Sequence, residues 1–223
     1  MNCRLILVLG ALLPLFTVHA QYEVALQLDK TTYVAQEPMT ATVTIINRSG
    51  ADVILGGPGG RPWLSFNVKD SLDRSISPLQ ATSDTPIPFP AGERISRKVQ
   101  LTETHSLTTP GTYAVTVSAY HPPSGDYYIS NRVRFVITDV KPYGTPLIFG
   151  VPEGYPDAGR KRQHVVMIYR DSERTYMYYR LVDERSGQKL MTYQLGPITV
   201  VRDPQITMDR GNNMHVMFLA SPD

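Results

Sequence analysis

Cysteine is almost absent from this chain of 223 residues. The single Cys3 precedes an apolar run, so it does not occupy the position of the lipid-bearing residue of a mature lipoprotein. From residue 21 onward the chain therefore has no disulfide, no thiol nucleophile and no thiolate metal ligand. A domain without disulfides needs a hydrophobic core of its own, and about 200 residues are enough to bury one.

Long apolar runs are also scarce. The run at residues 5–16 is too short to span a bilayer, which needs roughly 20 apolar residues. Arg4 stands before it and Val18-His19-Ala20 after it, so residues 1–20 predict a signal peptide that is cleaved near Gln21. An uncleaved anchor is the alternative, which the short run disfavours. We expect a periplasmic or secreted protein with no stable membrane span after cleavage.

The chain has little excess charge of either sign. Without Arg4, 21 basic side chains stand against 20 acidic ones, and the densest basic group, Arg160-Lys161-Arg162, is three residues long. Nucleic-acid binding requires a larger cluster of cations, so we expect no nucleic-acid partner. The glycine-rich segment 56–60 lacks the Lys-Ser/Thr ending of a phosphate loop, and we expect no cofactor.

Short strands separated by turns fill residues 22–139. After the turn signal Thr109-Pro110-Gly111, the apolar residues alternate with more polar ones, as in a half-buried strand: Tyr113, Val115, Val117 and Ala119. The apolar face of such a strand must lie on a second sheet to leave water. Seven or eight strands in about 120 residues predict an all-β, immunoglobulin-like sandwich.

The predicted organisation after the signal peptide has three parts. The sandwich covers residues 21–140, with the only tryptophan, Trp63, near its centre. Residues 141–146 contain Pro142, Gly144 and Pro146 and predict a linker. A smaller β-rich region follows at residues 147–223. Proline density excludes a central strand from residues 78–90.

Four segments of the first part resemble a known group: VTIINRSG at residues 43–50, FNVKD at 66–70, PAGE at 90–93 and PGTY at 110–113. They look like the bacterial immunoglobulin-like accessory domains of exported proteins. They are also similar to the small β-sandwich of a bacterial intracellular proteinase inhibitor family. The resemblance covers about half of the chain and implies a fold, whereas a fold does not carry a function with it.

The last part contains an internal repeat. His164-Val165-Val166-Met167 recurs 51 residues later as HVMF at residues 215–218. A period near 50 with about four strands is similar to the repeats of sialidase-like, BNR-type propellers. The segment Asp209-Arg210-Gly211 lacks the serine and tryptophan of that family's Asp-box, so sialidase chemistry is not implied. Two alternatives stay open: a truncated propeller, or a small open sheet that packs on the sandwich or on a second subunit.

Residues 175–182 predict a strand with two different faces. The aromatic rings and the guanidinium on one face are suited to glycan or peptide recognition: Tyr176, Tyr178 and Arg180. The other face carries Met177, Tyr179 and Leu181, which we expect to pack on the sandwich or on a second copy. The first face then remains free as the candidate binding face. Ordinary cross-strand pairing of the aromatic rings is the structural alternative.

The residues give little support for catalysis or metal binding. His164 and His215 have none of the spacings of metal ligands, and acidic pairs such as Asp171 and Glu173 are typical of turn caps. We find no nucleophile coupled to a base.

The chain therefore predicts a non-catalytic binding or assembly module with a protein or glycan partner. It also predicts self-association through open sheet edges. The alternatives are a fragment of a carbohydrate-active propeller enzyme and a sandwich that inhibits proteases.

Overall fold

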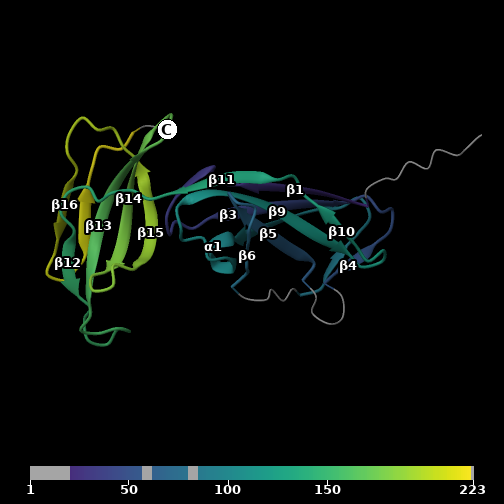
Figure 1. The fold of residues 1–223 in the computed structure, drawn as a ribbon, viewed down its shortest axis with the longest axis horizontal. Helices are drawn as coiled ribbons and strands as arrows, with labels where there is room; N and C mark the ends of the chain where they lie inside the picture. The colour runs from purple at the N-terminus through teal and green to yellow at the C-terminus, as the bar shows by residue number, and fades with distance from the viewer. Residues whose placement is uncertain (1–20, 57–61, 80–84, 222–223) are drawn as a thin grey trace, which may run out of the picture.

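A computed structural model describes residues 21–56, 62–79 and 85–221, and these are almost entirely β-structure (Figure 1). Within these ranges the one helix is α1 (Leu101–Thr104), a single turn. The predicted all-β class is confirmed. The signal peptide predicted at residues 1–20 and most of the glycine-rich segment lie outside the described residues.

The first half is a sandwich of two sheets. The smaller sheet has the order β1-β3-β8 and consists of β1 (Tyr22–Leu28), β3 (Thr40–Asn47) and β8 (Arg94–Gln100). The larger sheet has the order β2-β11-β9-β5-β6, and β10 also pairs with β9. Its strands are β2 (Thr32–Val34), β5 (Leu64–Asp70), β6 (Ser75–Ile76), β9 (Gly111–His121), β10 (Asp126–Ile129) and β11 (Val133–Thr138).

A separate two-stranded ladder joins β4 (Val53–Leu55) to β7 (Ile87–Phe89). Strand β7 contains Pro88, which has no N–H to donate to a ladder. The described residues of the proline-rich segment, 78–79 and 85–90, thus contribute a strand to this ladder and to neither large sheet, as the sequence predicts.

Strand β9 lies inside the larger sheet, between β11 and β5. Its inward side chains Val115, Val117 and Ala119 are fully buried in one continuous core with residues of the smaller sheet. Trp63 is buried in the same core, as predicted. Since burying one large aliphatic side chain contributes about 1.5–3 kcal/mol, this core is the main source of stability.

The start and the end of the sandwich are joined directly. Strand β2 pairs in parallel with β11, and the side chain of Asn131 both donates to and accepts from the backbone of Leu26 at 3.0 and 2.9 Å. The sandwich is therefore complete only when its last strand is in place.

The second half is built on a four-stranded antiparallel sheet in the order β12-β13-β14-β15. The strands are β12 (Leu147–Gly150), β13 (Lys161–Arg170), β14 (Thr175–Asp183) and β15 (Lys189–Pro197). A hairpin of β16 (Gln205–Met208) and β17 (Met214–Met217) follows. The residues predicted as a linker run beside β13, since the N–H of Tyr143 donates to the carbonyl of Val166 at 2.7 Å.

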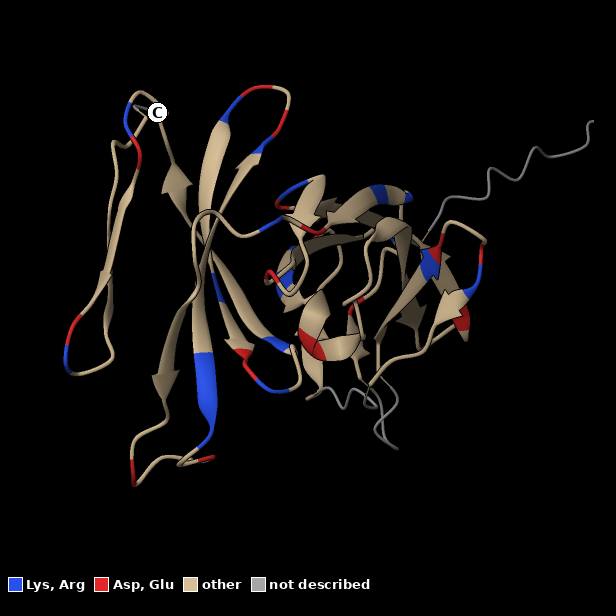
Figure 2. Cartoon of the chain, turned by 60° about the vertical axis from the view of Figure 1, so that its left-hand side comes forward, with Lys and Arg blue, Asp and Glu red and all other residues tan. Residues whose placement is uncertain are grey.

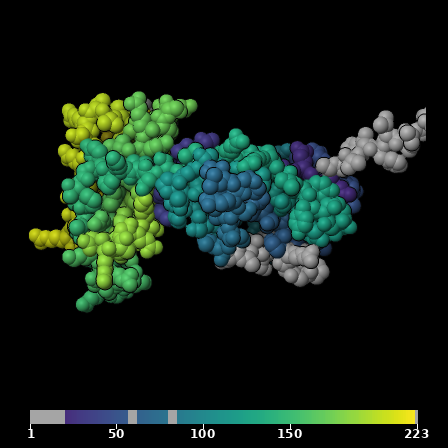
Figure 3. Space-filling view, in the orientation of Figure 1, coloured from purple at the N-terminus to yellow at the C-terminus, as the bar shows by residue number. Residues whose placement is uncertain are grey.

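The four-stranded sheet has an inner face toward the sandwich and an outer face away from it. On the inner face, Val165, Met167 and Tyr178 pack with Val34 of β2. On the outer face, Val166, Met177 and Ile198 pack under side chains of the hairpin, among them Ile206 and Val216. The two halves lie end to end along the long axis of the molecule (Figure 3).

The described residues form no propeller. His164 lies in β13, between β12 and β14 of the four-stranded sheet, whereas His215 lies in the two-stranded hairpin. The repeated segments therefore have different neighbours. Alternating apolar and polar residues are common to all half-buried strands, and this explains the repeat. The open sheet packed on the sandwich, one of the two alternatives, is the observed arrangement.

Candidate functional site

The face that carries Tyr176, Tyr178 and Arg180 packs on the sandwich. Tyr178 is 3% exposed and Arg180 is 4% exposed. The prediction that this face remains free is therefore wrong. Met177, Tyr179 and Leu181 do not pack on the sandwich, and their packing on a second copy stays a prediction.

Arg180 explains this orientation. Its guanidinium donates to Asp139 at 2.9 Å, to the carbonyl of Ala35 at 3.1 Å and to the hydroxyl of Thr192 at 3.1 Å. A buried guanidinium needs several acceptors in a fixed geometry, and this end of the sandwich supplies them. The apolar side chains of the other face could not use these groups.

Asp139 also forms an ion pair with a second cation, the ammonium of Lys189. Burial opposes ionisation of Asp139, but hydrogen bonds from Lys189 and Arg180 outweigh it and hold the pKa of the carboxyl below its usual value. The hydroxyl of Thr192 also donates to Ala35 at 2.8 Å. We call this group of Ala35, Asp139, Arg180, Lys189 and Thr192 the polar clamp.

Tyr176 and Tyr178 also line a polar cleft of about 700 Å³ beside the clamp. Tyr178 donates to Gln194 at 3.2 Å, and Lys30 bonds to both Gln194 and Glu37. The ammonium of Lys30 lies 5.8 Å from the centre of the Tyr178 ring. The aromatic and cationic groups in this cleft thus bind each other.

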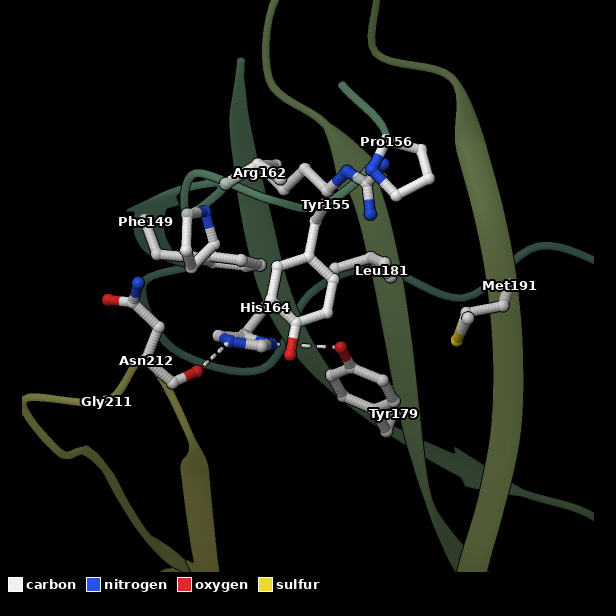
Figure 4. Close-up of a pocket in the computed structure, with 12 residues that line it drawn as sticks. Phe149, Tyr155, Pro156, Arg162, His164, Tyr179, Leu181, Met191, Gly211 and Asn212 are labelled. Atoms are coloured by element: carbon white, nitrogen blue, oxygen red, sulfur yellow. Dashed lines mark hydrogen bonds between the residues drawn. The ribbon is translucent and has the colours of Figure 1, made fainter. Parts of the chain in front are cut away.

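The outer face of the sheet holds a different cavity, of about 460 Å³, which we call the outer-face pocket (Figure 4). All four strands of the sheet contribute to its wall: Phe149, Arg162, His164, Tyr179, Leu181 and Met191. The loop at residues 151–156 adds Tyr155, and the turn between β16 and β17 adds Asn212. The hairpin covers the sheet beyond this turn.

His164 is the centre of the pocket. Its ring stacks on Phe149, with centroids 4.2 Å apart and an angle of 13° between the planes. Nε2 lies 3.1 Å from the carbonyl oxygen of Asn212, and Nδ1 lies 2.9 Å from the hydroxyl of Tyr179. A carbonyl only accepts, so this network assigns the proton to Nε2, and Nδ1 accepts from Tyr179.

Both polar side chains at the base of the pocket are uncharged at neutral pH. Burial lowers the pKa of His164, although the bond to the Asn212 carbonyl opposes this effect. Burial also raises the pKa of Tyr179 to about 12. The base is therefore neutral, and its hydrogen bonds are made within the protein.

A single cation, Arg162, lies in the wall. Its guanidinium donates to Asp157 at 3.1 Å, and Arg160 approaches the same carboxylate at 3.4 Å. The other side chains in the wall are mainly apolar. The arrangement suits an apolar or aromatic group, with one positive charge at the rim.

The remaining predicted positions have structural roles. Asp171 accepts from the N–H groups of Glu173 and Arg174, so the predicted turn cap at this position is confirmed. Asp70 caps its own turn in the same way, through the N–H groups of Leu72 and Arg74. His215 bonds to Asp209 at 3.1 Å on the hairpin.

Within the described ranges, no three potential metal ligands come together, and no helix is long and apolar enough to cross a membrane.

Comparisons with known proteins give no family. No protein-family model and no curated protein matches the chain. Among solved structures, a β-glucosidase from Erythrobacter marinus is 11% identical with a TM-score of 0.36, over 52% of this chain and 15% of its own. The sporulation control protein Spo0M from Bacillus subtilis is 10% identical with a TM-score of 0.37, over 79% of this chain and 91% of its own.

A β-glucosidase from Listeria innocua in complex with glucose is 14% identical with a TM-score of 0.30, over 52% of this chain and 16% of its own. The chain thus spans about one sixth of either glucosidase. Likenesses at this level carry no argument about function.

Proposed function

We propose that this protein is an exported, non-catalytic module that binds a partner protein through the outer-face pocket. Export rests on the signal peptide predicted at residues 1–20. The binding role rests on one observation: the pocket is concave and mainly apolar, and the polar groups at its base already bond to each other.

The energetics favour an apolar ligand. Tyr155 is 67% exposed and Met191 is 36% exposed beside a cavity whose size is typical of ligand sites. Removing apolar surface from water contributes roughly 25 cal/mol for each Å² buried. An aromatic or branched side chain of a partner would bury the rings and the methionine together.

A glycan is the less suitable ligand. Sugar hydroxyls need free donors and acceptors, whereas His164 uses both ring nitrogens internally and the amide of Asn212 donates to the carbonyl of Gly150 at 3.2 Å. The same bonds argue against general-base catalysis by His164. The proposed role is therefore protein recognition.

Ligand-detected and amide NMR with small probes tests the proposal. We expect indole and p-cresol to shift the amides of Phe149, Tyr179 and Met191, whereas glucose and cellobiose leave them unchanged. Tyr155→Ser should weaken indole binding at least about fivefold, since it removes one exposed wall without touching the core.

The matched control is Tyr127→Ser, which changes a similarly exposed tyrosine, 55% exposed, on the sandwich. It should leave indole binding unaltered. Equal effects of the two substitutions, or shifts by glucose without shifts by indole, would contradict the proposal.

A further inference from the structure

A second hollow adjoins the outer-face pocket, at the end of the sheet where β13 begins. It has a volume of about 880 Å³ and is lined by four cations: Arg160, Lys161, Arg162 and Arg185. Arg162 also lines the outer-face pocket, so the two hollows share a wall. We call the second one the basic hollow; its cations include the blue start of β13 in Figure 2.

The hollows are also continuous along β15. Leu190 lines the basic hollow and is 37% exposed, and the next residue, Met191, lines the outer-face pocket. Met191 pairs with Leu181, and Tyr193 pairs with Tyr179. An apolar strip thus connects the pocket to the basic end of the sheet.

The cations of the basic hollow are only partly neutralised. Three carboxylates lie among them, and two are already engaged: Asp157 pairs with two arginines, and Asp183 accepts from the N–H and the hydroxyl of Ser186. In the described part of the chain, neither Lys161 nor Arg185 has a carboxylate within ion-pair distance. The hollow keeps a net positive charge beside an apolar pocket.

We propose that the two hollows form one bipartite site for an extended acidic segment of a partner protein. This inference rests on the proposed function and specifies the chemistry of the partner. One aromatic side chain of the segment fills the outer-face pocket, and carboxylates a few residues away lie among the cations of the basic hollow. The shared Arg162 bridges the two halves of the ligand.

The chemistry of the two hollows favours a ligand that carries both an apolar group and carboxylates. A purely apolar group would leave Lys161 and Arg185 without a carboxylate, and a purely acidic one would leave Phe149 and Met191 in contact with water. Charged contacts also steer association, so binding should weaken as salt rises.

Three labelled peptides of equal length test this inference by fluorescence anisotropy at 50 and 300 mM salt. The first carries a tryptophan followed by three glutamates, the second has lysines in place of the glutamates, and the third has glycine in place of the tryptophan. We expect the first to bind at least about tenfold more tightly than either of the others, with the preference over the lysine peptide shrinking at 300 mM salt.

Substitution separates this inference from the proposed function. The double variant Lys161→Gln with Arg185→Gln should weaken the first peptide about tenfold and leave indole binding unchanged. The matched control, Arg94→Gln with Lys98→Gln, removes two exposed cations from β8 of the sandwich and should alter neither.

The outcomes are distinct. If the acidic and lysine peptides bind alike, or if both double variants bind the first peptide alike, the inference of an acidic partner segment is wrong. Indole binding would then still support the outer-face pocket as a binding site. If indole also fails to bind, the proposed function is wrong as well. A dimer in sedimentation that Tyr155→Ser abolishes would identify a second copy as the occupant and overturn the inference.

Discussion

The sandwich and the four-stranded sheet are held together in different ways. The sandwich has one continuous apolar core that runs through both of its sheets. The four-stranded sheet has two small clusters, and one of them includes Val34 of the sandwich. The first half therefore carries its own stability, whereas the second half depends on a neighbour on its inner face and leaves part of its outer face to solvent.

The largest expected effect is in the sandwich core. Phe135 is 1% exposed, and its ring centre lies 5.5 Å from that of Tyr113 and 6.0 Å from that of Tyr33. Phe135→Ala should cost about 3–5 kcal/mol, because it leaves a cavity in a close-packed core. Urea unfolding followed by the fluorescence of Trp63 measures this loss.

Phe218→Ala is the comparison in the second half. Phe218 directly follows β17 and is half-buried against the cluster of Val166, Met177 and Ile198, so its removal should cost under about 2 kcal/mol. Equal losses would show that the two halves are packed alike.

The next largest effect is a difference in stability loss between substitutions of the two tyrosines on the inner face, Tyr178 and Tyr176. Tyr178 is fully buried between β2 and the sheet, so Tyr178→Ala should cost about 3 kcal/mol. Tyr176 is half-buried, and Tyr176→Ala should cost about 1 kcal/mol. Thermal midpoints measure both, and a smaller loss for Tyr178 than for Tyr176 would contradict the assignment of the inner face.

Breaking the polar clamp should separate the halves. Arg180→Met removes the three hydrogen bonds of the guanidinium and should cost about 2 kcal/mol, with a separate early transition for the four-stranded sheet in calorimetry. The control is Arg134→Met on the exposed side of β11, which should leave one transition. A single transition for Arg180→Met would show that apolar packing alone holds the junction.

The smallest effect is the pH dependence of the clamp. The pKa of Asp139 is lower in the folded protein, so its contribution is complete above about pH 4 and is lost as the pH falls through the folded pKa. Since the side chain is 42% exposed, the contribution should be under about 1 kcal/mol.

Asp139→Asn lacks this contribution at every pH. The difference in urea midpoint between the two proteins should therefore narrow from pH 7 to pH 3. A difference that stays constant would exclude the carboxylate as the source.

The alternation of apolar and polar residues predicts the individual strands. It does not predict which face of the four-stranded sheet packs on the sandwich. Around Tyr113 the apolar side chains repeat every second residue beside a turn signal, and β9 follows from these local features. The choice between the faces of β14 depends on Arg180, whose partners Ala35 and Asp139 are 145 and 41 residues away. No local pattern carries that information.

The sequence does not predict the outer-face pocket, for the same reason. The alternation places Tyr179 and Leu181 on one face, but Phe149, Tyr155 and Asn212 come together only in the folded protein. The internal repeat around His164 and His215 suggested equivalent units, although only one of these histidines lies in the pocket. Residue type indicates aromatic and cationic candidates, whereas tertiary contacts determine which of them face solvent.

The parallel pairing of β2 with β11 has a kinetic consequence. Leu26 meets Asn131 across 105 residues, and the clamp joins Ala35 to Thr192 across 157. Contacts so distant in sequence slow folding, because the loop entropy is lost before any contact forms. During synthesis β2 has no strand to pair with until β11 has emerged, so the larger sheet of the sandwich closes only after most of the chain up to Thr138 has been made.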